Sequence, residues 1–128
     1  MKIAQIFFGI VYLGGAVANI TLTALNSPQS YYGFADGALI PFYRDAWAVL
    51  IVPHMTLFIS LLIVFEITLG LMFLIRRRLL RIALMVGALF CLGTAPFGIE
   101  AAYVNIPLGL VQAFLLWREL RIRAKEVK

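Results

Sequence analysis

The sequence predicts an all-α integral membrane protein, an antiparallel four-helix bundle with both termini in the cytoplasm. Hydrophobic residues make up 63% of the 128 residues and charged residues only 13%, whereas a soluble domain averages about 45–50% and about 25%. A globule of this size keeps roughly a third of its chain area wet, so most of this apolar surface must face lipid. The second observation is that the basic residues gather between or beside a few long apolar segments.

Four apolar segments are long enough to cross a bilayer as helices, which takes about 20 residues. They cover residues 3–25, 53–75, 79–96 and 101–117. The first ends at the turn signal Asn26-Ser27-Pro28. Its Ala16-Val17-Ala18 looks like a signal-peptide cleavage site, but the apolar run continues to Leu25. We therefore expect an uncleaved span.

The second segment is preceded by an apolar stretch over residues 45–52. One interpretation is a short interfacial helix capped by Asp45, followed by a new helix with Pro53 in its first turn. The alternative is a single kinked helix over residues 45–75. The sequence leaves both open.

The basic side chains predict which helix ends face the cytoplasm. With four spans, Arg44 falls on one side and the other ten Lys and Arg residues fall on the opposite side. The ten are Lys2, Arg76, Arg77, Arg78, Arg81, Arg118, Arg121, Arg123, Lys125 and Lys128. This asymmetry explains the net charge of +5 without a nucleic-acid partner. We expect a bacterial or archaeal inner membrane.

The longest segment between spans covers residues 26–47 and is rich in aromatic side chains, namely Tyr31, Tyr32, Phe34, Phe42, Tyr43 and Trp47. One interpretation is an aromatic belt at the membrane–water interface. The other is a lid over an outward-facing pocket, with Asp36, Arg44 and Asp45 as its polar groups.

Glu66 is the most informative residue for function. It lies ten residues before Arg76, which places it about 15 Å from the basic turn and near the midplane of a hydrocarbon core about 30 Å thick. A charge there costs at least about 2.5–3.5 kcal/mol. No basic residue lies at similar depth, so we expect Glu66 to be protonated at rest. A functional role and a buried hydrogen bond between helices both stay open.

Polar residues recur every seven positions in the first and fourth segments, and each set lies on one helix face. The sets are Gln5, Tyr12 and Asn19 in the first and Asn105, Gln112 and Glu119 in the fourth. With Gly15 and Gly109 beside them, we expect these two helices to pack together through the polar groups. The groups either hold the helices together or line a path for a small molecule or a proton.

Two further titratable residues lie at the predicted outer ends of the spans. His54 is either an interfacial residue or a proton carrier, and Glu100 suits the start of the fourth helix. We expect both to ring an outer vestibule with Asn19 and Asn105, above Glu66. One His and one Cys, Cys91, do not make a haem site, a zinc site or an internal disulfide, so no metal is expected.

The stretch Phe65-Glu66-Ile67-Thr68-Leu69-Gly70-Leu71, followed by an apolar half-turn and the basic turn Arg76-Arg77-Arg78, resembles the DoxX-like family of small four-helix membrane proteins. Gly9 and Gly14-Gly15 in the first segment are also similar to that family. The resemblance implies the four-helix fold and a loose association with membrane redox systems such as quinone-linked enzymes.

These observations predict a DoxX-like protein that binds a small apolar or amphiphilic ligand, a quinone or a lipid, near Glu66, or an accessory subunit of a membrane redox complex. A dimeric proton-coupled transporter that uses Glu66 is the second hypothesis. A small membrane isomerase with Glu66 and His54 as acid and base is the third. Expected partners are the bilayer and a second copy or a larger membrane complex.

Overall fold

The computed structural model describes residues 1–26, 28–75 and 77–126, and within these ranges it is helical, with no strand. Four helical segments are long and apolar enough to cross a membrane: Lys2–Thr23, Pro41–Ile75, Arg77–Phe97 and Ile99–Glu126. The predicted all-α class and its four membrane-compatible helices are therefore confirmed. Ser27, Arg76 and Lys128, which contributed to the predicted turn and basic clusters, lie outside the described residues.

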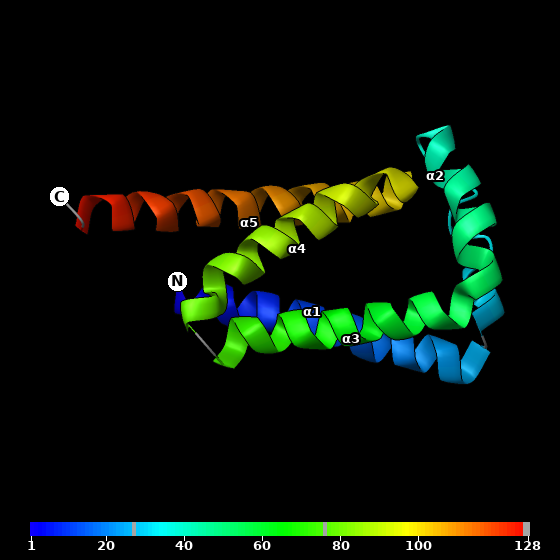
Figure 1. Cartoon of the computed structure of the whole chain (residues 1–128), viewed down its shortest axis with the longest axis horizontal. Helices are drawn as coiled ribbons and strands as arrows, with labels where there is room; N and C mark the ends of the chain where they lie inside the picture. Colours follow the sequence, from blue (N-terminus) through cyan, green and yellow to red (C-terminus); the bar gives the residue numbers. More distant parts are fainter. Residues whose placement is uncertain (27, 76, 127–128) are drawn as a thin grey trace.

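The long helices are arranged as two pairs. Helix α1 (Lys2–Asn26) packs along α3 (Met55–Ile75), and α4 (Leu80–Thr94) packs along α5 (Ile99–Glu126) (Figure 1). Figure 1 shows the start of α1, the α3–α4 turn and the end of α5 toward one end of the molecule, here called the basic end. Helix α2 (Pro41–Ala46) lies at the other end, here called the α2 end. Which side of the membrane each end faces stays a prediction.

The segment before the second span combines features of a separate interfacial helix and of a single kinked helix. The chain is helical from Pro41 to Ile75, through α2, a π-helical turn (Trp47–Ile51), a 3-10 turn (Val52–His54) and α3. Pro53 lies in the 3-10 turn, where its missing N–H interrupts α-helical hydrogen bonding. Figure 1 shows the α2 segment standing steeply across the end of α3. The segment therefore resembles an interfacial helix that continues through a bend into a spanning helix.

The predicted cap at Asp45 is wrong. Helix α2 begins at Pro41, and Ile40 precedes it without a side-chain capping bond. Proline suits this position because the first N–H groups of a helix have no partner inside it. Asp45 instead lies 3.5 Å from Arg44, in an ion pair whose side chains are 70% and 59% exposed.

The last span is longer than predicted. Helix α5 starts at Ile99 and continues past residue 117 to Glu126. The predicted end marked only where the apolar residues stop, since arginine and lysine are good helix formers. The Arg121 guanidinium lies 4.4 Å from the centroid of the Trp117 ring, an arrangement that stabilises the polar end of the helix. The predicted third span, residues 79–96, is α4 with its flanking 3-10 turns Arg77–Leu79 and Ala95–Phe97.

The core lies where α1, α3 and α4 meet. The rings of Phe8 and Tyr12 stack on Phe73, with centroids 5.6 and 5.8 Å apart. Helices α1 and α3 approach closely here, because a Cβ at Gly70 would lie 3.1 Å from the Gly9 carbonyl oxygen. Away from the core the helices present apolar side chains outward, such as Ile10 at 62% and Leu89 at 66% exposure. Contiguous apolar surface of this kind suits contact with lipid.

Candidate functional site

A cavity of about 530 Å³ lies toward the α2 end, between the two helix pairs. Most of its lining is apolar or aromatic, and every long helix contributes at least one residue. The lining residues are Asn19, Tyr31, Phe34, Trp47, Ile51, Met55, Phe58, Ile59, Leu62, Glu66, Phe90, Thr94, Phe97 and Asn105. Apolar walls with a few polar groups are typical of small-molecule sites, whose volumes run from about 300 to 1,000 Å³. We call this space the Glu66 cavity.

One wall of the Glu66 cavity carries a chain of hydrogen bonds that runs from Glu66 on α3 through Asn19 on α1 and Tyr31 to Trp47. Asn19 Nδ2 donates to Glu66 Oε2 at 2.8 Å. The Tyr31 hydroxyl donates to Asn19 Oδ1 at 2.9 Å, and Trp47 Nε1 donates to the Tyr31 carbonyl oxygen at 3.1 Å. The two bonds to Asn19 fix its amide orientation, since each amide atom has a partner of the matching kind. The Glu66 carboxyl is therefore held in one position at the cavity wall.

Gly15 makes room for this carboxyl. A Cβ built at Gly15 would lie 2.7 Å from Glu66 Oε1, closer than side-chain atoms pack, and 3.2 Å from Glu66 Cδ, a tight contact. Glu66 itself is only 7% exposed, and no described Lys, Arg or His side chain forms an ion pair with it. An isolated buried carboxylate is costly in such surroundings. This setting supports the expectation that Glu66 is protonated at rest, which stays a prediction.

The opposite wall carries a second, smaller polar pair. Asn105 Nδ2 on α5 donates to Thr94 Oγ1 on α4 at 3.2 Å, and Thr94 Oγ1 donates to the Phe90 carbonyl oxygen at 2.8 Å. Both side chains line the Glu66 cavity. Asn19 and Asn105 thus face one space from different helix pairs, and a ligand between them has polar groups on two sides.

A buried polar layer lies beyond the cavity, toward the basic end, and none of its residues lines the cavity. Tyr12, Cys91 and Gln112 are at most 4% exposed. The Tyr12 hydroxyl donates to Gln112 Oε1 at 3.1 Å, and Gln112 Nε2 donates to the Leu108 carbonyl oxygen at 3.2 Å and lies 3.5 Å from Cys91 Sγ. This layer joins α1, α4 and α5 in the middle of the molecule. Its side-chain polar groups satisfy one another, which suits a structural role.

The prediction that the first and last spans pack together through their polar residues is therefore wrong for most of these residues. Helix α1 packs on α3 and α5 packs on α4, and the predicted pair that bonds directly is Tyr12 with Gln112. Asn19 and Asn105 bond to Glu66 and Thr94 rather than to each other. Gly15 faces Glu66, and Gly109 faces Leu92 and Cys91. A seven-residue spacing gives the face of a helix but not the neighbour that this face meets.

Part of the aromatic segment covers the Glu66 cavity. Phe97, in the 3-10 turn before α5, contacts three rings of the segment: Phe34, Tyr43 and Trp47, at centroid distances of 5.4, 4.9 and 5.2 Å. We call these four rings the Phe97 cluster. Backbone Leu39 N also donates to the Pro96 carbonyl oxygen at 2.8 Å, and the Tyr43 hydroxyl donates to Gly93 O at 2.7 Å.

The Phe97 cluster ties the segment before α3 to the α4–α5 turn, and Phe34, Trp47 and Phe97 also line the cavity. This arrangement favours the lid interpretation for these rings. Phe42, at 72% exposure, suits the interfacial belt instead. The polar groups expected on the lid, Asp36, Arg44 and Asp45, do not line the cavity.

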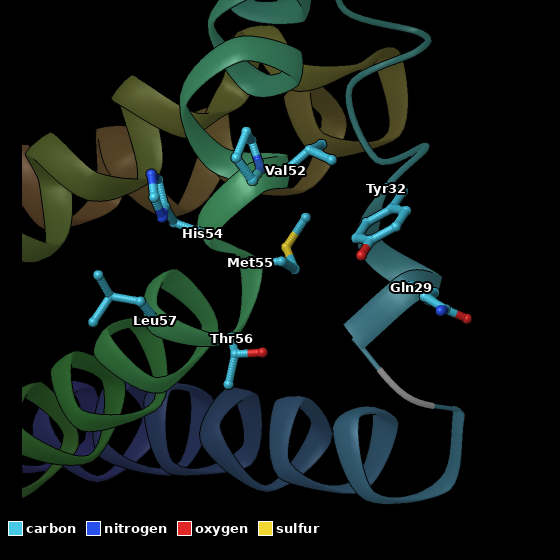
Figure 2. A pocket seen from close by; sticks show the side chains of 8 residues that line it. Gln29, Tyr32, Val52, His54, Met55, Thr56 and Leu57 are labelled. Carbon is cyan, nitrogen blue, oxygen red and sulfur yellow. The ribbon is translucent and has the colours of Figure 1, made fainter.

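His54 and Glu100 do not join the predicted vestibule. His54 is exposed and does not line the Glu66 cavity. It lines an adjoining hollow of about 290 Å³ that shares Met55 with the Glu66 cavity, and Figure 2 shows it pointing away from Tyr32 and Gln29. It therefore does not pair with Glu66 as an acid and base. Glu100 is exposed in the first turn of α5, where the helix dipole favours a carboxylate. The bend at Val52–His54 turns His54 away from the Glu66 cavity.

The sequence interpretation did not name Thr94 or Phe97 as a site residue, and it named Tyr31 and Gly15 only as a ring of the aromatic segment and a glycine beside the polar stripe. Their contacts with Asn105, Trp47, Asn19 and Glu66 depend on how the helices pack, which no local pattern signals. Among the described residues, no group of three or more His, Cys, Asp or Glu side chains lies close enough to hold a metal ion.

Comparison of the chain with protein-family models, with curated proteins and with solved structures finds no match.

Proposed function

We propose that this protein is a four-helix membrane protein that binds a small amphiphile in the Glu66 cavity. In this proposal the helices cross the membrane as an antiparallel bundle, with the basic end in the cytoplasm and the α2 end outside. The observation that carries the proposal is the Glu66 carboxyl, fixed by Asn19 in a cavity of about 530 Å³ whose walls are mostly apolar or aromatic. Membership of the DoxX-like family, and a role as an accessory subunit, stay predictions.

The chemistry of the walls supports a compact ligand with a flat apolar body and hydrogen-bonding groups at its edge. Phe34, Trp47, Phe90 and Phe97 place aromatic rings in the lining, and aromatic rings favour contact with another planar group. A neutral Glu66 donates a hydrogen bond to a carbonyl oxygen, and Asn105 on the opposite wall has amide donors and an acceptor. A quinone head has this shape and these acceptors. A lipid ester group is the second ligand of this class.

A binding role suits the cavity better than the other two predicted functions. The Tyr12–Cys91–Gln112 layer and the rings of Phe8 and Phe73 lie between the cavity and the basic end and are buried. A transport cycle would need that core to open. An isomerase would need a second acid–base group beside Glu66, and His54 lies in another hollow.

Fluorescence of Trp47 tests the proposal directly. Trp47 lines the cavity, whereas Trp117 lies on α5 beside Arg121. In a Trp117→Phe background, a short-chain ubiquinone is expected to quench Trp47 saturably. Glu66→Leu should weaken the binding at least about tenfold, because the ligand carbonyl loses its donor. Glu66→Gln should retain most of the affinity, since the amide can both donate and accept.

A monoacylglycerol titrated in competition identifies the lipid alternative, and mass spectrometry of organic extracts identifies the molecule that copurifies. Quenching that does not saturate, or that is the same in Glu66→Leu, would contradict the proposal.

Gly15→Ala offers a second test that leaves Glu66 in place. The new methyl group would meet Glu66 Oε1 and displace the carboxyl from Asn19. We expect ubiquinone affinity to fall about tenfold while the helices remain folded. Gly14→Ala is the matched control, because a Cβ there meets nothing within 4 Å, and both changes raise helix propensity equally. Equal affinity in the two variants would show that the carboxyl position does not matter for binding.

A further inference from the structure

A second cavity, of about 560 Å³, lies at the basic end between the start of α1 and the end of α3. Its lining includes two cationic side chains, one amide and several apolar side chains, among them Lys2, Arg77, Gln5, Ile6, Leu74 and Ile75. It shares no lining residue with the Glu66 cavity. We call it the Lys2 groove.

The charges of the Lys2 groove have no counterpart among the described residues. Among the described residues the ion pair is that of Arg44 with Asp45, which lies at the α2 end and not in the groove. No carboxylate lines the groove. Two cations that line one groove repel each other, and an anion between them would offset this repulsion. The groove therefore has an electrostatic preference for an anionic group near Lys2 and Arg77.

The walls below these cations are apolar and open. Ile6, Leu74 and Ile75 are 53%, 43% and 68% exposed, and they belong to helices suited to a membrane interior. Lys2 begins the first of these segments, and Arg77 begins the next segment along the chain, Arg77–Phe97. At such ends long basic side chains reach the interface between hydrocarbon and water. A ligand of the groove thus has its anionic part at the interface and an apolar part along α1 and α3.

From this arrangement we infer that the Lys2 groove binds an anionic phospholipid, with its phosphate between Lys2 and Arg77 and an acyl chain along Ile6 and Leu74. A free phosphate would use the cations but not the apolar walls. A second protein chain would leave the two cations without an anion unless it supplied a carboxylate. The inference does not depend on the ligand of the Glu66 cavity.

Native mass spectrometry of the full chain, released from detergent with defined lipids, tests this inference. We expect the wild type to retain phosphatidylglycerol in preference to phosphatidylcholine. The double variant Lys2→Gln/Arg77→Gln should reduce this retention by about fivefold for each charge removed. The matched control is Arg123→Gln/Lys125→Gln, which loses the same charge from exposed positions on α5 outside the groove. It should behave as the wild type does.

Three results would overturn the inference. They are equal retention of the two lipids by the wild type, equal losses in the two double variants, and displacement of the lipid by glycerol 3-phosphate at millimolar concentration. Equal retention of the two lipids would show that the groove has no preference for an anion. Equal losses in the two double variants would show that the preference comes from diffuse surface charge. Displacement by glycerol 3-phosphate would show that the acyl chains do not contribute to binding. Circular dichroism of each variant confirms that a loss of lipid is not a loss of helix.

Discussion

Replacing Gly87 with alanine is expected to destabilise the protein by about 2–4 kcal/mol, through overpacking and the loss of buried hydrogen bonds. A Cβ at Gly87 would overlap Gln112 Oε1 and lie 2.6 Å from the Tyr12 hydroxyl oxygen. Gln112 is fully buried and Tyr12 nearly so, so neither side chain can move aside into solvent. The Tyr12–Gln112 bond must lengthen or the helices must separate.

Unfolding in mixed micelles of increasing SDS content, followed by loss of helical signal, measures the effect. Gly93→Ala on the same helix is the control, since a Cβ there meets nothing within 4 Å. It should be neutral, or more stable by up to about 1 kcal/mol from helix propensity. If the two variants unfold at the same SDS fraction, the polar layer is not packed as described.

Replacing Phe97 with alanine is expected to loosen the lid and to lower ligand affinity at least about tenfold. Phe97 contacts Phe34, Tyr43 and Trp47, and each aromatic pair contributes about 0.5–1.5 kcal/mol beyond area burial. Removing the shared ring releases the segment before α3 from the α4–α5 turn, apart from the Leu39 and Tyr43 hydrogen bonds. A tenfold change in affinity corresponds to about 1.4 kcal/mol, and the loss of these aromatic pairs is large enough to account for it.

Hydrogen exchange over residues 28–54 and Trp47 quenching by the short-chain ubiquinone measure the two effects. Phe42→Ala is the control within the same segment, because Phe42 is 72% exposed and its ring pairs with Tyr43 rather than with Phe97. It should leave both measurements near wild-type values. If exchange rises in Phe97→Ala but affinity is unchanged, the lid is not needed for binding. If neither changes, the cluster does not hold the lid.

Features that depend on one helix alone, such as its length and its hydropathy, were predicted well from the sequence. Four apolar stretches became four long helices, because membrane compatibility depends on local hydropathy and length. The prediction that Glu66 is an unusual buried carboxyl agrees with its 7% exposure and its bond to Asn19. Helix ends were less predictable. Arg118 and Arg121 end the apolar run but not α5, and Asp45 lies inside the helix that it was expected to cap.

The relations between helices were not predictable in the same way. Asn19 was expected beside Asn105 and instead bonds to Glu66, and His54 was expected above Glu66 and instead faces another hollow. Both outcomes depend on helix rotation and on the bend at Val52–His54. These are set by contacts such as Phe97 with Trp47 and Gly70 with Gly9, whose partners are far apart in the chain.

The sequence by itself determined that this protein is all-α with four helices that could cross a membrane. It also singled out Glu66 as a carboxyl with few partners. It could do so because the cost of placing a charge or an apolar run in lipid depends on each segment alone. Only the tertiary structure decided that Asn19, Tyr31 and the Phe97 cluster meet around Glu66, and that Lys2 and Arg77 share a groove. Those associations depend on how helices rotate and approach one another, which close packing between distant residues determines.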